Sequence, residues 1–230
     1  RDYGGQPLLQ AQLMETLAET HTRLGQDEKA LELVEAALAT HRRLLGADHP
    51  LSIQSLARRG SVYVDIGKGQ LALVDMEQAL KAARRVLGDK DPITSRIMAK
   101  TALTLGGSGA GTEVDALAQA ERLAREALDN QRRALGNDHR HTLEALDALV
   151  IILVWNQKAK QALPLAKELH ERTSRIPVET EKKMAASERL AMVYNALGQN
   201  AESETIMRQL VQEATNSLGS AHPVTMRHMV

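Results

Sequence analysis

The sequence predicts an all-α fold in which helix pairs stack side by side into a solenoid. Three observations support this prediction: an internal repeat of about 42 residues, apolar residues three or four positions apart between its turns, and no stretch with the two-residue alternation of a strand. Hydrophobic residues make up 43% of the chain, which suffices for a packed core, whereas Phe is absent. The core is therefore expected to consist of Leu, Ala, Val, Ile and Met, of which Ala and Leu favour helices most.

A six-residue string that recurs four times sets the length of the repeat. It begins with Leu-Gly and reads LGADHP from Leu45, LGDKDP from Leu87, LGNDHR from Leu135 and LGSAHP from Leu218. Its starts are separated by 42, 48 and 83 residues, so one interval is six residues too long and the last spans almost two repeats. The extra residues are the run 106–111 (GGSGAG), and a degenerate copy of the string is expected near Arg175-Ile176-Pro177.

A second turn separates the two helices of each repeat. It reads LG, IG, LG, NQ and LG at residues 24–25, 66–67, 105–106, 156–157 and 197–198. Gly after the last apolar residue of a helix is typical of a C-cap, where the chain enters the left-handed region. In the linker strings, Asp followed one or two residues later by Pro predicts an N-cap and the first turn of the next helix.

The apolar residues between these turns predict the helices in order. In the first helix Leu9, Leu13, Leu17, His21 and Leu24 form one apolar stripe. Five pairs are expected, at 8–24 with 28–45, 51–66 with 70–87, 93–105 with 115–135, 142–156 with 159–175, and 179–197 with 201–218. We therefore expect one solenoid over residues 8–224, with units near 8–45, 51–87, 93–135, 142–175 and 179–218. Residues 1–7 are expected to be disordered or extended, and residues 225–230 to begin a truncated sixth unit.

Large and small residues recur at fixed places within the units. The first helix carries a large residue followed by a small one, then an aromatic residue or His, then Leu-Gly, and the second helix carries Ala, an apolar residue and Ala. In the first unit these are Leu17, Ala18, His21, Leu24, Gly25, Ala30, Val34 and Ala37; the second has Gly60, Tyr63, Met76 and Ala79, and the fifth has Ala191, Tyr194 and Met207. This pattern resembles the tetratricopeptide repeat (TPR), and the 42-residue length with its LGxDHP linker resembles the kinesin-light-chain-like subtype found in bacterial multidomain signalling proteins.

The resemblance covers about residues 8–218 and implies a right-handed superhelical α-solenoid of about five TPR-like helix pairs. It also implies a cytoplasmic protein-protein interaction scaffold, without catalysis, that binds a protein or peptide in its concave groove. Two alternatives stay open. One is a homodimer through the solenoid ends, which would bury apolar faces that no capping helix covers. The other is a regulatory arm of a larger signalling enzyme, such as a Ser/Thr kinase or a nucleotide-binding ATPase; because the chain starts at Arg1 rather than Met, we expect a segment of a longer protein.

Composition and motifs argue against several other classes. The chain has 29 basic and 29 acidic residues and no basic block, so no nucleic-acid partner is expected. The longest apolar run, 148–155, is too short to span a bilayer, so no membrane partner is expected. Cys is absent, which excludes thiolate metal sites. The run 106–111 follows a helix and no Lys follows it, which favours a flexible loop over a phosphate-binding loop.

No catalytic, cofactor-binding or metal site is predicted. The signatures GxSxG and HExxH and those of protein kinases do not occur in the sequence. His49, His139 and His222 recur at one place in the linker strings, and in a solenoid they would be too far apart to share a metal ion. Each is therefore expected to form local hydrogen bonds at a turn or a helix start.

A partner is expected on the concave wall, which the first helix of each pair lines in a solenoid. The predicted partner-binding residues face away from the packing stripe and are Glu15, Glu19, Arg23, Gln54, Arg58, Asp65, Arg96, Lys100, Glu144, Asp147, Ile151, Trp155, Glu188 and Asn195. They give the groove a basic middle and an acidic stretch beyond it, which suit an extended peptide of complementary charge. Trp155, the only Trp, is expected either to be an interaction hot spot or to pack under the fourth turn.

Overall fold

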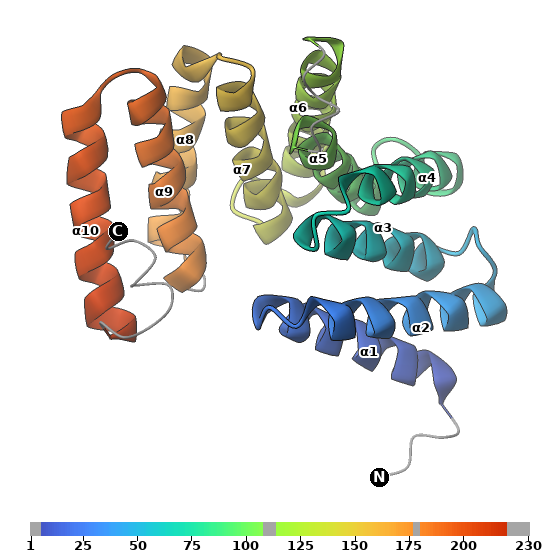
Figure 1. Cartoon of the computed structure of the whole chain (residues 1–230). Coiled ribbons are helices and arrows are strands. Elements are labelled where there is room, and N and C mark those ends of the chain that lie inside the picture. The colour runs from blue at the N-terminus through green and yellow to red at the C-terminus, as the bar shows by residue number, and fades with distance from the viewer. Residues whose placement is uncertain (1–5, 108–113, 177–179, 220–230) are drawn as a thin grey trace. The chain divides into compact units, whose positions relative to one another are not determined.

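Helices joined by short turns make up most of the structure (Figure 1). It is a computed structural model that describes residues 6–107, 114–176 and 180–219. Within these ranges the helices are α1 (Pro7–Arg23), α2 (Asp27–Leu45), α3 (Pro50–Asp65), α4 (Gly69–Leu87), α5 (Pro92–Gly107), α6 (Val114–Leu135), α7 (Arg140–Trp155), α8 (Ala159–Arg175), α9 (Thr180–Ala196) and α10 (Asn200–Leu218). Every predicted helix end lies within two residues of the observed one, and no strand occurs in the described ranges. The predicted all-α repeat solenoid is therefore confirmed.

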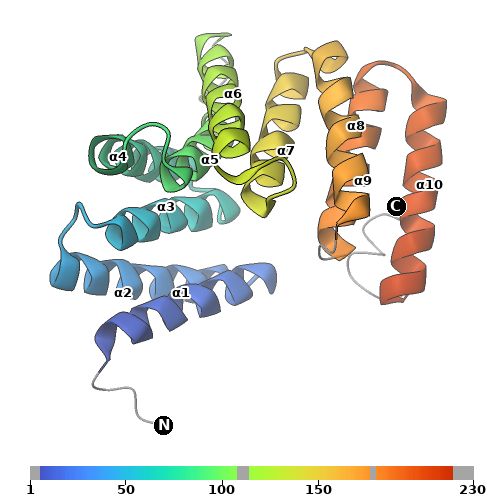
Figure 2. The ribbon, with the colours of Figure 1, turned by 180° about the vertical axis from the view of Figure 1, so that it is seen from behind.

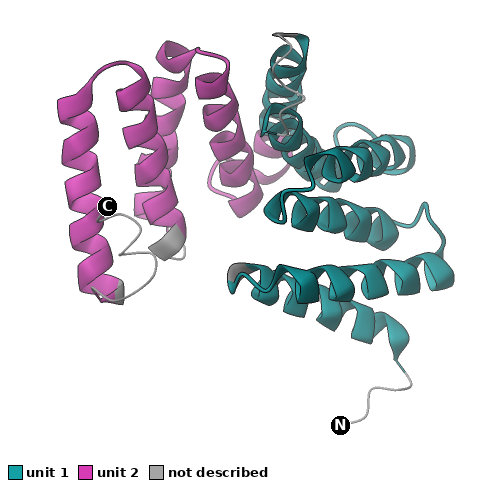
Figure 3. Ribbon diagram, viewed as in Figure 1, with its two compact units in different colours: residues 1–130 teal, residues 131–230 magenta. Residues whose placement is uncertain are grey.

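The helices belong to two compact units, Arg1–Asn130 (unit 1) and Gln131–Val230 (unit 2), with the boundary inside α6 (Figure 3). In unit 1, α1 packs against α2, α2 against α3, α3 against α4, and α4 against α5. In unit 2, α7 packs against α8, α8 against α9, and α9 against α10. Views from opposite sides show α1 beside α2 and α9 beside α10 (Figures 1 and 2). Below, the odd-numbered helices are called first helices and the even-numbered ones second helices.

Some predictions concern residues outside the described ranges. These residues are 1–5 of the N-terminal segment, 108–111 of the glycine run, Pro177 of the degenerate linker, His222, and the proposed sixth unit 225–230. The single solenoid over residues 8–224 and its right-handed superhelix stay predictions.

The turns have the glycine geometry that the sequence predicts, with one exception. Gly46 and Gly88, which follow α2 and α4, both have a φ of 88°, a left-handed value that favours Gly. Within the pairs, Gly25 and Gly198 have φ values of 67° and 73°. In the fourth pair the same turn carries Gln157, whose φ of 56° is the only left-handed value of a residue other than Gly among the described residues. The turn geometry is thus kept where Gly is missing.

The Asp N-caps predicted from Asp followed by Pro are correct at Asp91 and wrong at Asp48. At the start of α5, Asp91 Oδ1 accepts a hydrogen bond from the backbone N–H of Ile93 at 2.7 Å. At the starts of α3 and α7, however, the N-caps are His49 and His139, whose Nδ1 atoms each accept a backbone N–H at 3.2 Å. The reason is position, because the cap is the residue immediately before the first helical one. The predicted local hydrogen bonding of these two His residues is confirmed.

The Asp residues displaced from the caps bind Arg side chains of the following second helix instead. Asp48 pairs with Arg85 near the end of α4, and Asp138 accepts a hydrogen bond from Arg172 of α8 at 2.7 Å. These contacts are exposed, so each contributes little to stability. They do recur at the same place in both units.

Small residues let the two helices of a pair pack closely. A side chain of the next pair then packs between these two helices. A Cβ atom added to Gly60 of α3 would lie 3.2 Å from the side chain of Met76 in α4. In the first pair, Ala18, Ala30 and Val34 form a buried cluster with Val62 of α3. The side chain of Val62 therefore packs the second helix pair against the first.

The predicted packing stripe of α1 is exposed, which corrects the face assigned to this helix. Leu13 and Leu17 expose 43% and 51% of their surfaces, and Leu24 is more exposed still. The fully buried residues of α1 are Ala11 and Ala18, because α1 meets its neighbours through small side chains. Periodicity found the stripe but did not show which side of the helix is covered.

Candidate functional site

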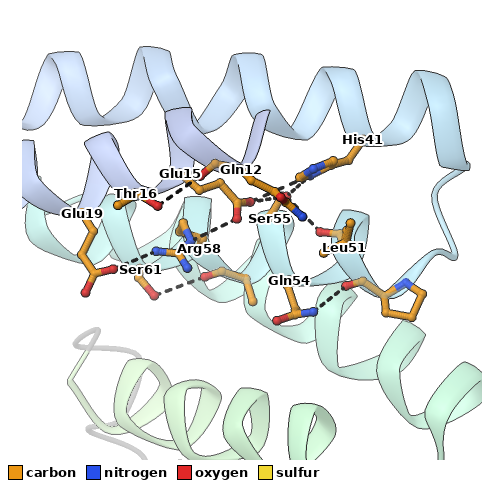
Figure 4. Close-up of polar contacts among 12 residues, drawn as sticks. Gln12, Glu15, Thr16, Glu19, His41, Leu51, Gln54, Ser55, Arg58 and Ser61 are labelled. Atoms are coloured by element: carbon orange, nitrogen blue, oxygen red, sulfur yellow. Dashed lines mark hydrogen bonds and ion pairs between the residues drawn. The ribbon is translucent and has the colours of Figure 1, made fainter. Parts of the chain in front are cut away.

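The first helices of unit 1 present charged side chains that bind across neighbouring pairs (Figure 4). Arg58 of α3 lies between two carboxylates of α1, with its Nε 3.7 Å from Glu15 and its Nη1 3.4 Å from Glu19. These three predicted groove residues are thus brought together on adjacent first helices. Arg58 keeps about a third of its side chain exposed, so it can still meet a ligand.

The next step of this polar row joins α3 to α5. Arg96 Nη2 donates to Gln54 Oε1 at 2.5 Å, and Lys100 Nζ donates to Ser61 Oγ at 3.0 Å. Ser61 lies between Arg58 and Asp65 on the same face of α3, as expected from the helical spacing of these residues. The cations predicted for the middle of the groove therefore bind side chains of the preceding first helix, and their role in a partner-binding groove stays a prediction.

A buried polar chain underlies this row at the junction of α1, α2 and α3. Ser55 Oγ contacts Glu15 Oε1 and lies 2.7 Å from Nδ1 of His41, a second-helix residue with no exposed surface. Burial lowers the pKa of His41, opposed by the nearby charge of Glu15. The carboxylate contacts the hydroxyl and not the far side of the imidazole, which differs from the order of a catalytic triad. Ser55 is itself buried, so this chain seats α3 on the first pair.

Unit 2 repeats the ion pair at the same register. Arg189 Nε of α9 donates to Asp147 Oδ1 of α7 at 2.8 Å, and these residues hold the repeat positions of Arg58 and Glu15. Burial raises the pKa of Asp147, and Arg189 opposes this shift. The 42-residue spacing of Arg189 and Asp147 is the signal that could have revealed the pair.

Glu144, a turn earlier on α7, is the second predicted acidic residue beside this pair. Burial alone would raise its pKa, but the hydrogen bond with His141 and the charges of Arg140 and Lys182 lower it below its usual value. The distances to Glu144 are 3.0 Å from His141 and 3.9 Å from Lys182 of α9. The acidic stretch is therefore largely neutralised by the protein's own cations.

A cavity of about 220 Å³ opens among α7, α8 and α9 beside these charges. Its lining consists of Leu143, Leu169, Thr173, Ala185 and Ala186 with Arg140, Glu144, Asp147 and Lys182. The small side chains of Ala185 and Ala186 stand where α3 carries Gln54 and Ser55 and α5 carries Arg96 and Ile97. Ala185 thus lacks the long side chain that α3 and α5 carry at its position, and Ala186 lacks the Ile of α5, which leaves room for the cavity.

The remaining predicted groove residues lie further along the helices. Trp155 ends α7 and exposes 42% of its surface, so its ring is accessible, while Ile151 is half-buried. Asp65 and Asn195 are exposed. Partial desolvation of the Asp65 carboxyl by neighbouring protein, helped by the charge of Asp27, raises its pKa. Glu188 lies 3.9 Å from Arg189. The side chain of Arg23 is outside the described part of the structure.

Comparisons with known proteins agree with the repeat architecture. The family model described as tetratricopeptide repeat matches residues 9–73, and a second model of that description matches residues 184–224. No curated protein matches the chain.

Within the described residues, no group of three or more His, Asp or Glu side chains could hold a metal ion, and no helix is long and apolar enough to cross a membrane.

Solved structures with the same fold are distant in sequence. One, of a Podosopora anserina protein described as a kinesin light chain with nearly identical TPR-like repeats, has 20% identity, covers 92% of this chain and 97% of its own, and has a TM-score of 0.70. Another, of BtubC (BKLC) from P. vanneervenii, has 16% identity, covers 96% of this chain and 85% of its own, and has a TM-score of 0.72. These likenesses concern the fold alone.

Proposed function

The chain is an array of tetratricopeptide repeats with the fold of kinesin-light-chain-like repeats, and we propose that it is a scaffold that binds a peptide or protein segment on its first helices. Proteins with such repeats generally bind proteins or peptides and are typically not catalytic. In this chain the first helices carry the exposed charged residues that a polar segment would need, among them Arg58 and Glu19.

The cavity among α7, α8 and α9 is the observation that supports this function best. Ligand sites are concave, mostly apolar, and bordered by a few polar groups that orient what enters. Here Leu143, Leu169 and the two Ala residues supply the apolar surface, and Glu144 and Lys182 supply polar groups. We therefore expect the bound segment to anchor one bulky aliphatic side chain, such as Leu or Met, in this cavity.

Filling the cavity tests this anchor. Peptides selected from a displayed random library on the immobilised chain would be synthesised, and their Kd values measured by calorimetry. Ala186→Ile supplies the side chain that α5 carries at the same repeat position, and it should weaken binding about tenfold or more, because burying an aliphatic side chain contributes about 1.5–3 kcal/mol. The matched control is Ala36→Ile on the exposed face of α2. Equal affinity of wild type and Ala186→Ile, or no selected binder, would contradict the proposal.

Reversing charge tests the first helices of unit 1 separately. Arg96→Glu with Lys100→Glu should abolish binding of any peptide that crosses this row and leave helicity by circular dichroism unchanged, because neither residue is buried. Lys29→Glu with Lys81→Glu, on exposed faces of α2 and α4, makes the same change of charge as a control. Full retention of binding by the first double variant would exclude this row from the site.

A further inference from the structure

The imidazole of His41 is the only titratable side chain with no exposed surface among the described residues. It stands on α2 where α3 docks on the first pair, and it faces Ser55 of α3 and Glu15 of α1 (Figure 4). At the same repeat position the other second helices carry residues that do not titrate, namely Ala83, Gln131, Thr173 and Ala214. The junction of α1, α2 and α3 therefore differs from the other docking contacts in having a buried group that can gain a proton.

The hydrogen bonds around Ser55 fix where the ring proton of neutral His41 lies. The Ser55 hydroxyl has a single hydrogen and donates it to the carboxylate of Glu15, which can only accept. Nδ1 of His41 lies 2.7 Å from the same hydroxyl oxygen, so Nδ1 must donate to it and carries the ring proton. The unprotonated atom is therefore Nε2, which is buried and has no hydrogen-bond partner among the described residues.

A second proton on His41 has to enter at Nε2. It would create a charged N–H group in the interior without an acceptor, which is unfavourable. The charged groups around the ring act in opposite directions. Glu15, 3.9 Å from Nδ1, favours the charged form, whereas His49 of the following linker disfavours it. Arg58 of α3 lies 3.7 Å from Glu15 and already neutralises part of its charge. Burial has the largest effect and lowers the pKa of His41 from 6.5.

From this arrangement we infer that proton uptake by His41 opens the junction, so that α3 separates from α1 and α2 more often in mild acid. In the open junction both ring nitrogens reach water, and the imidazole takes up a proton without leaving an N–H group unpaired. Opening also breaks the contacts that Arg58 makes with Glu15 and Glu19. The inference does not depend on the proposed peptide binding, because it concerns only contacts within the chain.

Native-state hydrogen exchange of the 230-residue chain measures this opening. After correction for the intrinsic effect of pH on exchange, the opening constant of α1 to α3 should rise between pH 7.5 and 5.5. The rise should reach up to about tenfold, because an accessible imidazole with a pKa of about 6.5 is protonated over this range while the buried one stays neutral. The amides of α7 and α8 should show no such rise. An opening constant of α1 to α3 that is the same at both pH values would overturn the inference.

A variant and its matched control identify the sensor. His41→Asn removes the titrating group and keeps a donor for Ser55, so opening of α1 to α3 should become independent of pH. In unit 2, His170 of α8 contacts Ser187 of α9 at 3.2 Å in a similar way, but its side chain is only half-buried. His170→Asn should therefore leave the pH dependence of unit 1 unchanged. If His41→Asn keeps the wild-type dependence, or if His170→Asn abolishes it, another group is the sensor and the inference is wrong.

A second variant serves if His41→Asn does not fold. His41→Ala with Ser55→Ile copies Ala83 and Ile97, which hold these two repeat positions where α5 docks on the second pair. Circular dichroism and urea unfolding at pH 7.5 check that each variant folds. The double variant should show equal opening of α1 to α3 at pH 7.5 and 5.5, and a remaining rise in acid would again contradict the role of His41.

Discussion

The second and fifth helix pairs dock on the pair before them through the same ion pair but with different packing beside it. In unit 1, Arg58 meets Glu15, and polar side chains fill the neighbouring space. In unit 2, Arg189 meets Asp147 at the same repeat position, and the small side chain of Ala186 helps to leave a cavity. The ion pair that aligns two helix pairs and the side chains that fill the space beside it can therefore vary separately in this repeat. The ion pair sets which residues face each other, and the size of the side chains beside it determines whether a cavity remains at the interface.

The largest expected effect concerns an ion pair within a helix pair that only unit 1 has. Arg59 donates to both oxygens of the buried Asp75 at 2.7 and 2.8 Å, whereas Leu190 and Ile206 hold these positions in unit 2. Arg59→Leu should lower the free energy of unfolding by about 3 kcal/mol, because it leaves a buried carboxylate unpaired. Urea unfolding followed by circular dichroism measures the loss.

The double variant Arg59→Leu with Asp75→Ile is the control for this pair. It copies the apolar arrangement of unit 2, and it should recover most of the stability lost by Arg59→Leu, since apolar replacements of buried ion pairs are often neutral. If the double variant is less stable than Arg59→Leu, the two units differ in more than this pair.

A smaller loss is expected where unit 1 brings its helices closest. Gly60→Leu should cost about 1–3 kcal/mol through overpacking, because even a Cβ atom there lies 3.2 Å from Met76 and 3.3 Å from the carbonyl oxygen of Ala72. In unit 2 the same position already carries Ala191. The melting temperature reports the effect, and an unchanged value would contradict the repeat register used here.

A gain of about 1 kcal/mol is expected from Gln157→Gly. This residue adopts a φ of 56° where Gly25, Gly67 and Gly198 stand in other pairs, and the left-handed region costs a residue with a Cβ atom about 1–2 kcal/mol. The greater freedom of Gly in the unfolded chain offsets part of that gain. Urea unfolding of the chain measures it, and Lys167→Gly, at an exposed position in the middle of α8, is the control, which should destabilise.

The smallest effect is a pH dependence confined to unit 1. Burial lowers the pKa of His41 from 6.5, so the unfolded chain binds a proton there more readily than the folded one. Stability from this residue is present above pH 6.5 and is lost as the pH falls below it. The drop in urea midpoint between pH 7.5 and 5.5 should be smaller for His41→Asn than for wild type. An equal drop would mean that His41 titrates normally.

Much of the fold could be predicted because the repeated Leu-Gly turns mark where helices end. Few residues other than Gly adopt the left-handed conformation that these turns need, so the Gly positions indicate the helix ends. The face of α1 did not follow, because a stripe such as Leu13 and Leu17 is apolar whether it meets its own pair or a further surface. Likewise, Asp48 was predicted as a cap, but His49 stands one place closer to the helix and is the N-cap.

The candidate site followed only in part. Arg58, Glu15 and Glu19 share a face by periodicity, and the structure brings them together. Their mutual pairing was not foreseen, because it joins residues about one repeat apart. The cavity depends on the small side chains of Ala185 and Ala186, and their effect could be recognised only by comparison with the larger residues of other repeats.

The polar row on the first helices also bears on how the protein folds and unfolds. Its contacts join residues 39 to 43 positions apart, as in Arg58 to Glu19 and Arg58 to Glu15, so each one couples neighbouring pairs only. In such an array, stability is close to a sum over pairs and their shared interfaces. A ligand held at one interface should therefore slow hydrogen exchange most in the two pairs that form it and progressively less in pairs farther along the same unit.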